Sequence, residues 1–446
     1  MKRNCIYFFI ILSCLLHADM QASGFYVANN GNNSVSIGSL NAITGIVTDQ
    51  TPATFNAPGT VAITPDGSTA YVTNSNGNSV SIINVATNAV TGIVTDQIPA
   101  TFNFPQYIAI TPDGSTAYVT NSIGNTVSVV NIATNMVTGI VTDQTPATFN
   151  GLGYIAITPD GSAAYVTNAN GNTVSVINVT TNTVTGIVTD QTPATFNVPE
   201  KIAITPNGST AYVTNSVGGT VSIIDVGTNT VTGIVTDQTP ATFNNPNFVA
   251  VTPFGDTAYV TNISGNTISI INVATNAVTG IVTDQTPATF NEPIAIAITP
   301  DGSTAYVANL TGNTASIISI VTNTVTGVVA DPSNTINAPV SIAIIAPVAY
   351  KSAVSTKLNK SVLITLTATT QDGNLLNFSI VTPPTNGTLG AITQPSTGGI
   401  TQQATVLYTP NQCSYGSDSF TFIATDNGVN SNVATVSITV ICTCCF

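Results

Sequence analysis

Short β-rich runs separated by turn residues recur along most of the chain. One unit contains the runs Ile-Ala-Ile-Thr, Thr-Ala-Tyr-Val-Thr-Asn, Val-Ser-Val-Ile-Asn-Val and Val-Thr-Gly-Ile-Val-Thr, with Pro-Asp-Gly, Gly-Asn and Ala-Thr-Asn between them. β-branched residues dominate the runs, no run has a helical period, and the residues between them favour turns. The pattern therefore predicts four β-strands in each unit.

The unit recurs seven times. Its Tyr-Val-Thr-Asn or Tyr-Val-Ala-Asn signature repeats after 45 residues once and after 47 residues five times. Four strands in a repeat of this length are typical of one β-propeller blade, and propellers usually have about 4 to 8 blades. The signature tyrosines are Tyr26, Tyr71, Tyr118, Tyr165, Tyr212, Tyr259 and Tyr306.

A linear β-solenoid is the rival architecture, and the ends of the repeat region favour the propeller. The region begins within a unit, at the second run (24–28), and residues 338–344 supply another copy of the first run after the seventh unit. A final copy that completes the first unit closes a ring and removes unpaired strand edges. We expect a seven-bladed β-propeller over residues 24–346, closed by a C-terminal strand that completes the first blade.

Residues 347–446 lose the repeat but stay β-rich. Short β-runs alternate with polar turns over about 100 residues, which is the spacing of a small β-sandwich. The runs cover residues 361–368, 376–381, 404–408, 419–424 and 433–440. The chain is therefore expected to be all-β, with an immunoglobulin-like sandwich after the propeller.

Both segments resemble known families. The Tyr-Val-Thr-Asn signatures resemble YVTN-type propeller repeats, relatives of the lactonase-like seven-bladed propellers, over residues 24–346. Residues 379–389 and 416–422 resemble bacterial immunoglobulin-like or cadherin-like domains. The resemblance implies these folds and a secreted or cell-surface setting. It says much less about activity, because a fold hosts functional sites without implying them.

No cofactor is expected. Some domains similar to the tail bind calcium, so the resemblance raises calcium as a candidate ion. The tail offers only Asp372, Asp418 and Asp426, which is too few carboxylates for a dedicated calcium site. Asp418 is expected to fix a turn instead.

Residues 1–23 are typical of a secretory signal. Lys2 and Arg3 precede a 12-residue apolar run, and small residues follow near a cleavage point. This run is too short to span a bilayer, and no later run is long enough for a transmembrane segment. We expect a protein that is secreted, periplasmic or on the cell surface.

Charge is scarce and negative. The chain has a formal net charge of −13 and only 6% charged residues, and its single His and single Arg both lie in the leader, at His17 and Arg3. Without them, the rest of the chain has no imidazole base and no guanidinium for phosphates. Nucleic-acid binding, which requires a basic surface, is excluded. The composition also speaks against an enzyme.

Four cysteines lie close to the C-terminus. A disulfide from Cys413 to Cys442, Cys444 or Cys445 suits an oxidising compartment. A zinc site is the alternative, but Cys-Thr-Cys-Cys does not have the usual ligand spacing. The disulfide is the preferred interpretation.

The aspartates and tyrosines of the repeat have structural interpretations. An aspartate in the long connection of each unit could form an acidic ring, but it ends the outermost strand, where seven carboxylates cannot converge. We expect these aspartates, and those of Pro-Asp-Gly, to fix turns. The signature tyrosines are expected to form the core between blades rather than a binding surface.

The repeats differ mainly before Ile-Ala-Ile and in the Asn-x-Gly-Asn turn. Blade geometry places both on one face, and aromatic residues often anchor partners. Neutral drift in loops is the alternative explanation. The candidate partner-binding residues are Phe104, Tyr107, Tyr154, Glu200, Lys201, Phe248 and Glu292.

These observations favour an exported, non-enzymatic binding or adhesion protein whose propeller face recognises a protein or carbohydrate ligand. A lactonase-like hydrolase is the alternative, and it would depend on Glu200 or Glu292. Glu200 and Lys201 are adjacent, so a strand would point them to opposite sides. A structural component of a surface coat is a third possibility.

Overall fold

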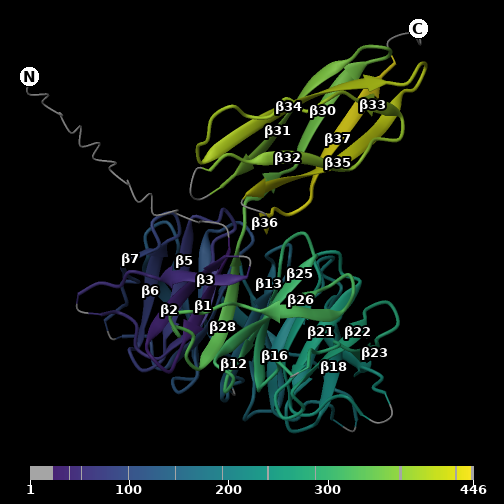
Figure 1. Cartoon of the computed structure of the whole chain (residues 1–446). Helices are drawn as coiled ribbons and strands as arrows, with labels where there is room; N and C mark the ends of the chain where they lie inside the picture. Colours follow the sequence, from purple (N-terminus) through teal and green to yellow (C-terminus); the bar gives the residue numbers. More distant parts are fainter. Residues whose placement is uncertain are drawn as a thin grey trace, which may run out of the picture.

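The computed structural model describes residues 24–442, except 40, 52, 99, 146, 193, 239–240, 287, 371–373 and 427–428. Within these residues the fold is all-β, with seven four-stranded blades followed by a β-sandwich (Figure 1). The predicted fold class is confirmed. Among the residues described, no helical segment has the length and apolar character of a membrane span. The predicted signal segment, 1–23, lies outside the described residues.

Each blade has four strands in antiparallel order. The innermost strands are β4 (Pro58–Ile63), β8 (Pro105–Ile110), β12 (Leu152–Ile157), β16 (Pro199–Ile204), β20 (Pro246–Val251), β24 (Pro293–Ile298) and β28 (Pro339–Ile345). The second strands are β1 (Gly24–Asn29), β5 (Thr69–Asn74), β9 (Thr116–Asn121), β13 (Ala163–Asn168), β17 (Thr210–Asn215), β21 (Thr257–Asn262) and β25 (Thr304–Asn309). The third strands are β2 (Ser34–Ser39), β6 (Ser79–Asn84), β10 (Thr126–Asn131), β14 (Thr173–Asn178), β18 (Thr220–Asp225), β22 (Thr267–Asn272) and β26 (Thr314–Ser319). The outermost strands are β3 (Ala42–Ile46), β7 (Ala89–Ile93), β11 (Met136–Ile140), β15 (Thr183–Ile187), β19 (Thr230–Ile234), β23 (Ala277–Ile281) and β27 (Thr324–Val328).

The ring closes through the first blade. β28 pairs antiparallel with β1, in a register that sets Gly24 opposite Ile345 and Ala28 opposite Ser341. Each innermost strand contacts the next, and β28 contacts β4. The prediction that a C-terminal strand completes the first blade is confirmed, and this closed ring excludes the linear solenoid.

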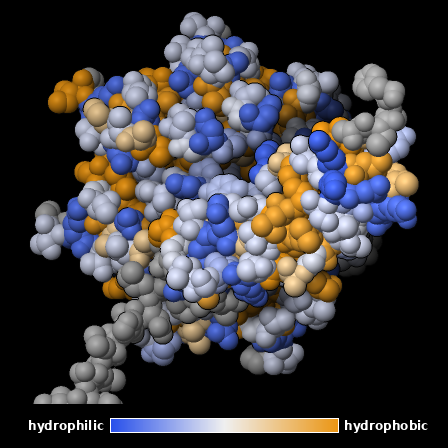
Figure 2. Space-filling view, turned by 90° about the horizontal axis from the view of Figure 1, so that it is seen from above, coloured by the Kyte–Doolittle hydropathy of each residue, from blue (hydrophilic) through white to orange (hydrophobic). Residues whose placement is uncertain are grey.

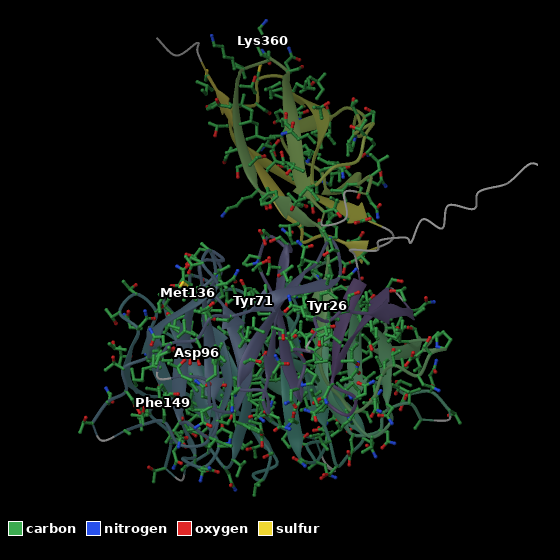
Figure 3. All side chains as sticks on the ribbon, turned by 90° about the vertical axis from the view of Figure 1, so that its left-hand side faces the viewer. Tyr26, Tyr71, Asp96, Met136, Phe149 and Lys360 are labelled. Atoms are coloured by element: carbon green, nitrogen blue, oxygen red, sulfur yellow. The ribbon has the colours of Figure 1, made fainter. Side chains whose placement is uncertain are left out.

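The signature tyrosines fill the seams between blades, as predicted. Tyr71 is 1% exposed, and its hydroxyl donates a 2.6 Å hydrogen bond to Asn135 Oδ1 in the next blade. Equivalent bonds join Tyr26 to Asn88 and Tyr212 to Asn276, each at 2.5 Å. Figure 3 shows Tyr26 and Tyr71 within the propeller. In the described part of the chain, six of the seven seams therefore combine a buried ring with a hydroxyl that is hydrogen-bonded to an asparagine of the next blade.

The aspartates fix turns, also as predicted. Asp96 (Figure 3) accepts hydrogen bonds from the backbone N–H groups of Gln97, Thr101 and Phe102 at 2.7–3.0 Å, which folds the connection after the outermost strand. In the Pro-Asp-Gly turns, Asp113 accepts from the Thr111 hydroxyl at 2.5 Å. Both sets of aspartates are therefore hydrogen-bonded within their own turns. The first set lies around the perimeter of the propeller, and the Pro-Asp-Gly set lies on one face.

The outer rim of the propeller includes an exposed apolar side chain from every blade. Each outermost strand exposes one isoleucine or valine at its end. Figure 2 shows hydrophobic residues at the rim among hydrophilic ones. A β-bulge interrupts the pairing of each outermost strand with the third strand, for example between Ile37 and Gly38, and bulges help to protect strand edges from further pairing. The rim residues are Ile46, Ile93, Ile140, Ile187, Ile234, Ile281 and Val328.

The tail is a two-sheet sandwich around a core that includes Phe378, Phe420 and Phe422. One sheet has the order β29 (Val348–Tyr350), β31 (Val362–Thr369), β34 (Thr401–Pro410) and β33 (Gly387–Leu389). The other has the order β30 (Ser352–Lys357), β37 (Ala434–Ile441), β35 (Gly416–Asp426) and β32 (Asn377–Thr382), with β36 (Val429–Asn430) paired to β35.

The sandwich stands on the Pro-Asp-Gly face of the propeller (Figure 1). Asn430 Nδ2 donates a 2.9 Å hydrogen bond to Asp301 Oδ2 in the β24–β25 turn. Tyr350 lines a cavity together with Asp66 and Asp113 of two other such turns. The opposite face, where the innermost strands begin, therefore stays clear of the sandwich.

The acidic and cysteine residues of the tail have specific positions. Asp418 is 8% exposed and accepts hydrogen bonds from the Tyr408 hydroxyl and from the backbone of Thr385 and Asn386, so it fixes a turn as expected. Asp372, the third residue of the suggested calcium set, lies outside the described residues.

Cys413 is exposed and forms no disulfide within the described part of the chain. Its backbone N–H donates to Asn359, and the neighbouring Leu358 bonds to Ile441 beside Cys442. Cys413 and Cys442 therefore lie at the same end of the sandwich. Cys444 and Cys445 lie outside the described residues, so the disulfide stays a prediction.

Candidate functional site

One position in each blade builds a pocket in the channel of the propeller. It is the third residue of every innermost strand, and we call these seven residues the channel ring. All seven line one cavity of about 210 Å³. The channel ring consists of Thr60, Tyr107, Tyr154, Lys201, Phe248, Ala295 and Ser341.

A second ring follows the same geometry. The fifth residue of every innermost strand is alanine, from Ala62 in β4 to Ala343 in β28, and all seven are partly exposed. Alternate residues of a strand point to the same side, so the alanines lie next to the channel ring along the strands. The channel ring therefore varies from blade to blade, whereas the alanine ring beside it is constant.

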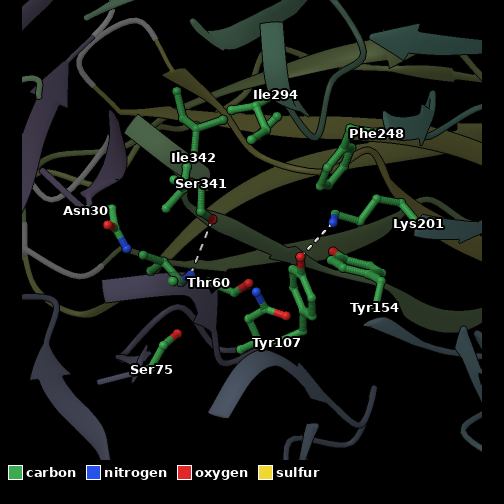
Figure 4. Close-up of a pocket in the computed structure, with 15 residues that line it drawn as sticks. Asn30, Thr60, Ser75, Tyr107, Tyr154, Lys201, Phe248, Ile294, Ser341 and Ile342 are labelled. Carbon is green, nitrogen blue, oxygen red and sulfur yellow. Dashed lines mark hydrogen bonds between the residues drawn. The ribbon is translucent and has the colours of Figure 1, made fainter. Parts of the chain in front are cut away.

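Large residues occupy one side of the channel ring. Tyr107, Tyr154 and Phe248 make edge-to-face contacts, with ring centroids 5.3 Å apart for the first pair and 5.6 Å for the second. Lys201 reaches across this group, and its Nζ lies 2.7 Å from the Tyr107 hydroxyl (Figure 4). The four residues come from consecutive blades, β8, β12, β16 and β20.

Small, polar and aliphatic residues form the other side. Thr60, Ala295 and Ser341 leave open space there, and Ser341 Oγ accepts a 3.3 Å hydrogen bond from the backbone N–H of Val61 (Figure 4). Asn30 and Gln106 add amide groups to the lining. Val61, Ile294, Val340 and Ile342 line the pocket as well. The pocket therefore sets an aromatic and cationic wall against a mixed wall of hydroxyl, amide and aliphatic groups, an arrangement suited to a small molecule that carries hydroxyl groups.

Lys201 is the only lysine or arginine in residues 24–346, which also contain 15 carboxylates. It is 6% exposed, and its Nζ lies 4.3 Å from the centroid of the Tyr107 ring and 5.9 Å from that of Tyr154. Burial, and after it the neighbouring phenol of Tyr107, raises the pKa of Tyr154 to about 12. Tyr154 is therefore a neutral phenol near pH 7.

Glu200 does not accompany Lys201 into the pocket. Its Oε1 accepts a 3.2 Å hydrogen bond from Ser216 Oγ, and it is absent from the pocket lining. Alternation along β16 separates the two side chains, as the sequence predicts.

Phe104 and Glu292 occupy the loop position directly before an innermost strand. Both have a positive φ, 58° and 52°, and their backbone N–H groups each donate a 2.7 Å bond to an asparagine of the adjacent second-to-third-strand turn. They lie on the face where the pocket's strands begin, but they do not line the pocket. The structure thus brings together four of the seven candidates: Tyr107, Tyr154, Lys201 and Phe248.

Sequence reasoning missed the opposite wall. Thr60, Ser341, Asn30 and Gln106 are small or neutral residues that attract no attention individually. A signal was present, because Thr60 and Ser341 occupy the same repeat position as Tyr107 and Lys201. Reading that position through all seven blades would have found the whole channel ring.

Comparisons with known proteins agree with both parts of the fold. Residues 103–237 match the family model of the lactonase seven-bladed β-propeller, and residues 345–439 match the bacterial Ig domain. The chain thus combines a lactonase-like propeller with a bacterial Ig-like domain, and the predicted resemblance is confirmed. No curated protein matches the chain.

Similar solved structures share the propeller fold at low sequence identity. A proposed 6-phosphogluconolactonase from Bacteroides uniformis is 17% identical, with a TM-score of 0.57 over 73% of this chain and 100% of that one. The periplasmic gluconolactonase of Pseudomonas aeruginosa is 16% identical, with a TM-score of 0.55 over 73% and 99%. The hydrazine synthase of Kuenenia stuttgartiensis is 24% identical, with a TM-score of 0.51 over 59% and 76%.

Proposed function

We propose that this lactonase-like propeller binds a sugar-derived lactone in the Lys201 pocket and promotes its hydrolysis. The observation that carries the proposal is the Lys201–Tyr107 pair, a buried ammonium and a phenol 2.7 Å apart in the channel. The propeller family and its gluconolactonase neighbours support this function more than the adhesion function expected from composition.

The pair suits the charge that forms during hydrolysis. When water attacks a lactone carbonyl, negative charge develops on the carbonyl oxygen, and nearby donors stabilise that charge best where water is excluded. Lys201 Nζ and the Tyr107 hydroxyl are donors of this kind. The ring ester bond then breaks, and the water supplies one oxygen of the new carboxylate. One of its protons goes to the former ring oxygen, which becomes a hydroxyl group, and the other is released to the solvent.

The residues that line the pocket include no carboxylate and no imidazole. Water is therefore not activated by a strong base, and oxyanion stabilisation is the main contribution of the protein. Sugar δ-lactones react with water without a catalyst, so this contribution gives a moderate acceleration on a reactive substrate. Glu200 and Glu292, the carboxylates first considered for hydrolysis, take no part because neither lines the pocket.

The test is hydrolysis of glucono-1,5-lactone, followed by titration of the released acid. Lys201→Met is expected to lower the protein-dependent rate about 100-fold, as does the loss of an oxyanion donor elsewhere. Lys357→Met is the matched control, because it removes the same charge at an exposed position in the tail. No acceleration by the native protein, or full activity in Lys201→Met, would overturn the proposal.

Adhesion to a protein or carbohydrate partner, in a secreted, periplasmic or cell-surface setting, is the second candidate function. It is favoured by the position of Phe104 and Glu292, on the varied face away from the sandwich. A double variant, Phe104→Asn with Glu292→Asn, tests it, because Asn245 already occupies the equivalent position with a φ of 55°. Reduced adhesion with unchanged lactone hydrolysis supports this function, and unchanged adhesion contradicts it.

A further inference from the structure

Among the residues that the structure describes, Lys201 has no carboxylate partner. Its Nζ carries three N–H donors, and within the described residues one of them is used, by the Tyr107 hydroxyl. No carboxylate lines the pocket, and Glu200 is hydrogen-bonded to Ser216 instead. An ammonium group that is 6% exposed and faces only neutral partners is unfavourable unless something else compensates it.

The aromatic wall compensates the charge only in part. The ring of Tyr107 lies within cation–π range of Nζ, and the ring of Tyr154 lies at the limit of that range. These contacts stabilise the ammonium on one side. On the other side the pocket is open toward Thr60 and Ser341, so the uncompensated charge faces the space that a ligand would fill.

We propose that the pocket holds the open-chain hydroxy acid, as its carboxylate anion, more tightly than the neutral lactone. This inference rests on the proposed function, because it concerns the same pocket and the same ligand class. The carboxylate lies at Lys201 Nζ and the Tyr107 hydroxyl and supplies the missing counter-charge. The hydroxylated chain extends toward Thr60, Ser341 and the amides of Asn30 and Gln106.

The proposal has a functional consequence. The product of lactone hydrolysis is the ligand that Lys201 favours, so the product stays bound and inhibits further turnover. A protein with this preference both opens the lactone and retains the acid. Its steady-state rate should therefore fall as acid accumulates, well before the lactone is exhausted.

The decisive comparison uses gluconate and glucitol, which share a six-carbon polyol chain and differ in the carboxylate. Isothermal titration of the full chain is expected to show gluconate binding at least about tenfold more tightly, the effect of a charge-assisted hydrogen bond in a desolvated site. In Lys201→Met the difference should vanish, whereas Lys357→Met should retain it. Acetate should bind weakly, because it lacks the hydroxylated chain.

A second variant guards against misfolding of Lys201→Met. Ala295→Leu keeps the lysine but fills the pocket from the opposite wall, so both ligands should lose affinity while the circular dichroism spectrum stays native. If gluconate and glucitol bind equally and Lys201→Met changes neither, the anion preference is wrong but the pocket stands. If neither ligand, nor the lactone, binds the native protein, the proposed function itself fails.

Discussion

The seams between blades and the channel ring use the same repeat in opposite ways. At the seams, every blade contributes a tyrosine, and each lies buried against the next blade. In the channel, the third residue of the innermost strand changes through threonine, tyrosine, lysine, phenylalanine, alanine and serine. A near-identical repeat thus secures closure at the seams, and a varied position creates one asymmetric pocket.

The comparison predicts that stability depends on the seams and ligand binding on the channel. The largest effect is expected for Tyr212→Ala. Tyr212 is 0% exposed, and truncation of a large buried aromatic side chain costs about 3–5 kcal/mol. Phe248→Ala, at a half-buried position of the channel ring, should cost clearly less but weaken ligand binding. Urea unfolding of both variants measures the difference. Equal losses of unfolding free energy would contradict the distinction between the seams and the channel.

Lys201→Met should change stability in the other direction. Because Lys201 is buried without a carboxylate partner, an apolar side chain of similar length removes a desolvation penalty. We expect the unliganded protein to gain about 1 kcal/mol in unfolding free energy. A loss of stability in chemical denaturation would show that Lys201 has a structural role rather than a role in binding.

A substitution at Val198, directly before β16, is expected to give a smaller gain in unfolding free energy. Val198 has a φ of 54°, and a β-branched residue in this left-handed region is strained. Asn245 has the same backbone conformation one blade further on. Val198→Asn should therefore raise stability by about 0.5–1 kcal/mol, and Val198→Ala by less. Thermal unfolding measures both, and an equal effect of the two changes would contradict the strain.

The smallest of the expected effects is that of acid on the Pro-Asp-Gly turns. Protonation of their aspartates should lower the unfolding free energy. Hydrogen bonds from the Thr158 hydroxyl and from the backbone and side chain of Ser162 lower the pKa of Asp160. A lowered folded-state pKa contributes stability that is present above the unfolded value, about 3.9, and is lost as the pH falls through the folded-state value.

Asp160→Asn should remove this pH dependence while keeping the turn, because Asn207 already occupies the equivalent position and accepts from the hydroxyl of Thr205 at 2.7 Å. The native protein and the variant should have similar unfolding midpoints at pH 7, and the gap should change only below about pH 4. A difference between the two unfolding midpoints that stays constant with pH would argue against a titrating carboxylate at this turn.

Much of the fold could be predicted from the sequence because it depends on local rules repeated seven times. Pro-Asp-Gly fixes a turn wherever it occurs, and the extra strand at 338–344 has one partner left, β1. The seam tyrosines follow from the same regularity. Local chemistry repeated at a constant spacing therefore defines the scaffold.

The pocket depends on the curvature of the ring, which no local pattern encodes. Lys201 and Tyr107 are 94 residues apart, and they meet because β8, β12 and β16 converge on the channel. Tyr107, Tyr154 and Phe248 were expected from the sequence to anchor a partner on the surface, whereas they line the channel and pack on one another. The contact between Asn430 and Asp301, which places the sandwich on the opposite face, was equally invisible to sequence reasoning.

The most direct test of the central claim is a crystal structure of the full chain with gluconate. The account predicts a single bound molecule in the channel, with its carboxylate within hydrogen-bonding distance of Lys201 Nζ and the Tyr107 hydroxyl and its hydroxyl groups toward Thr60 and Ser341. A ligand bound on the Pro-Asp-Gly face, or in the channel with its carboxylate turned away from Lys201, would contradict the account.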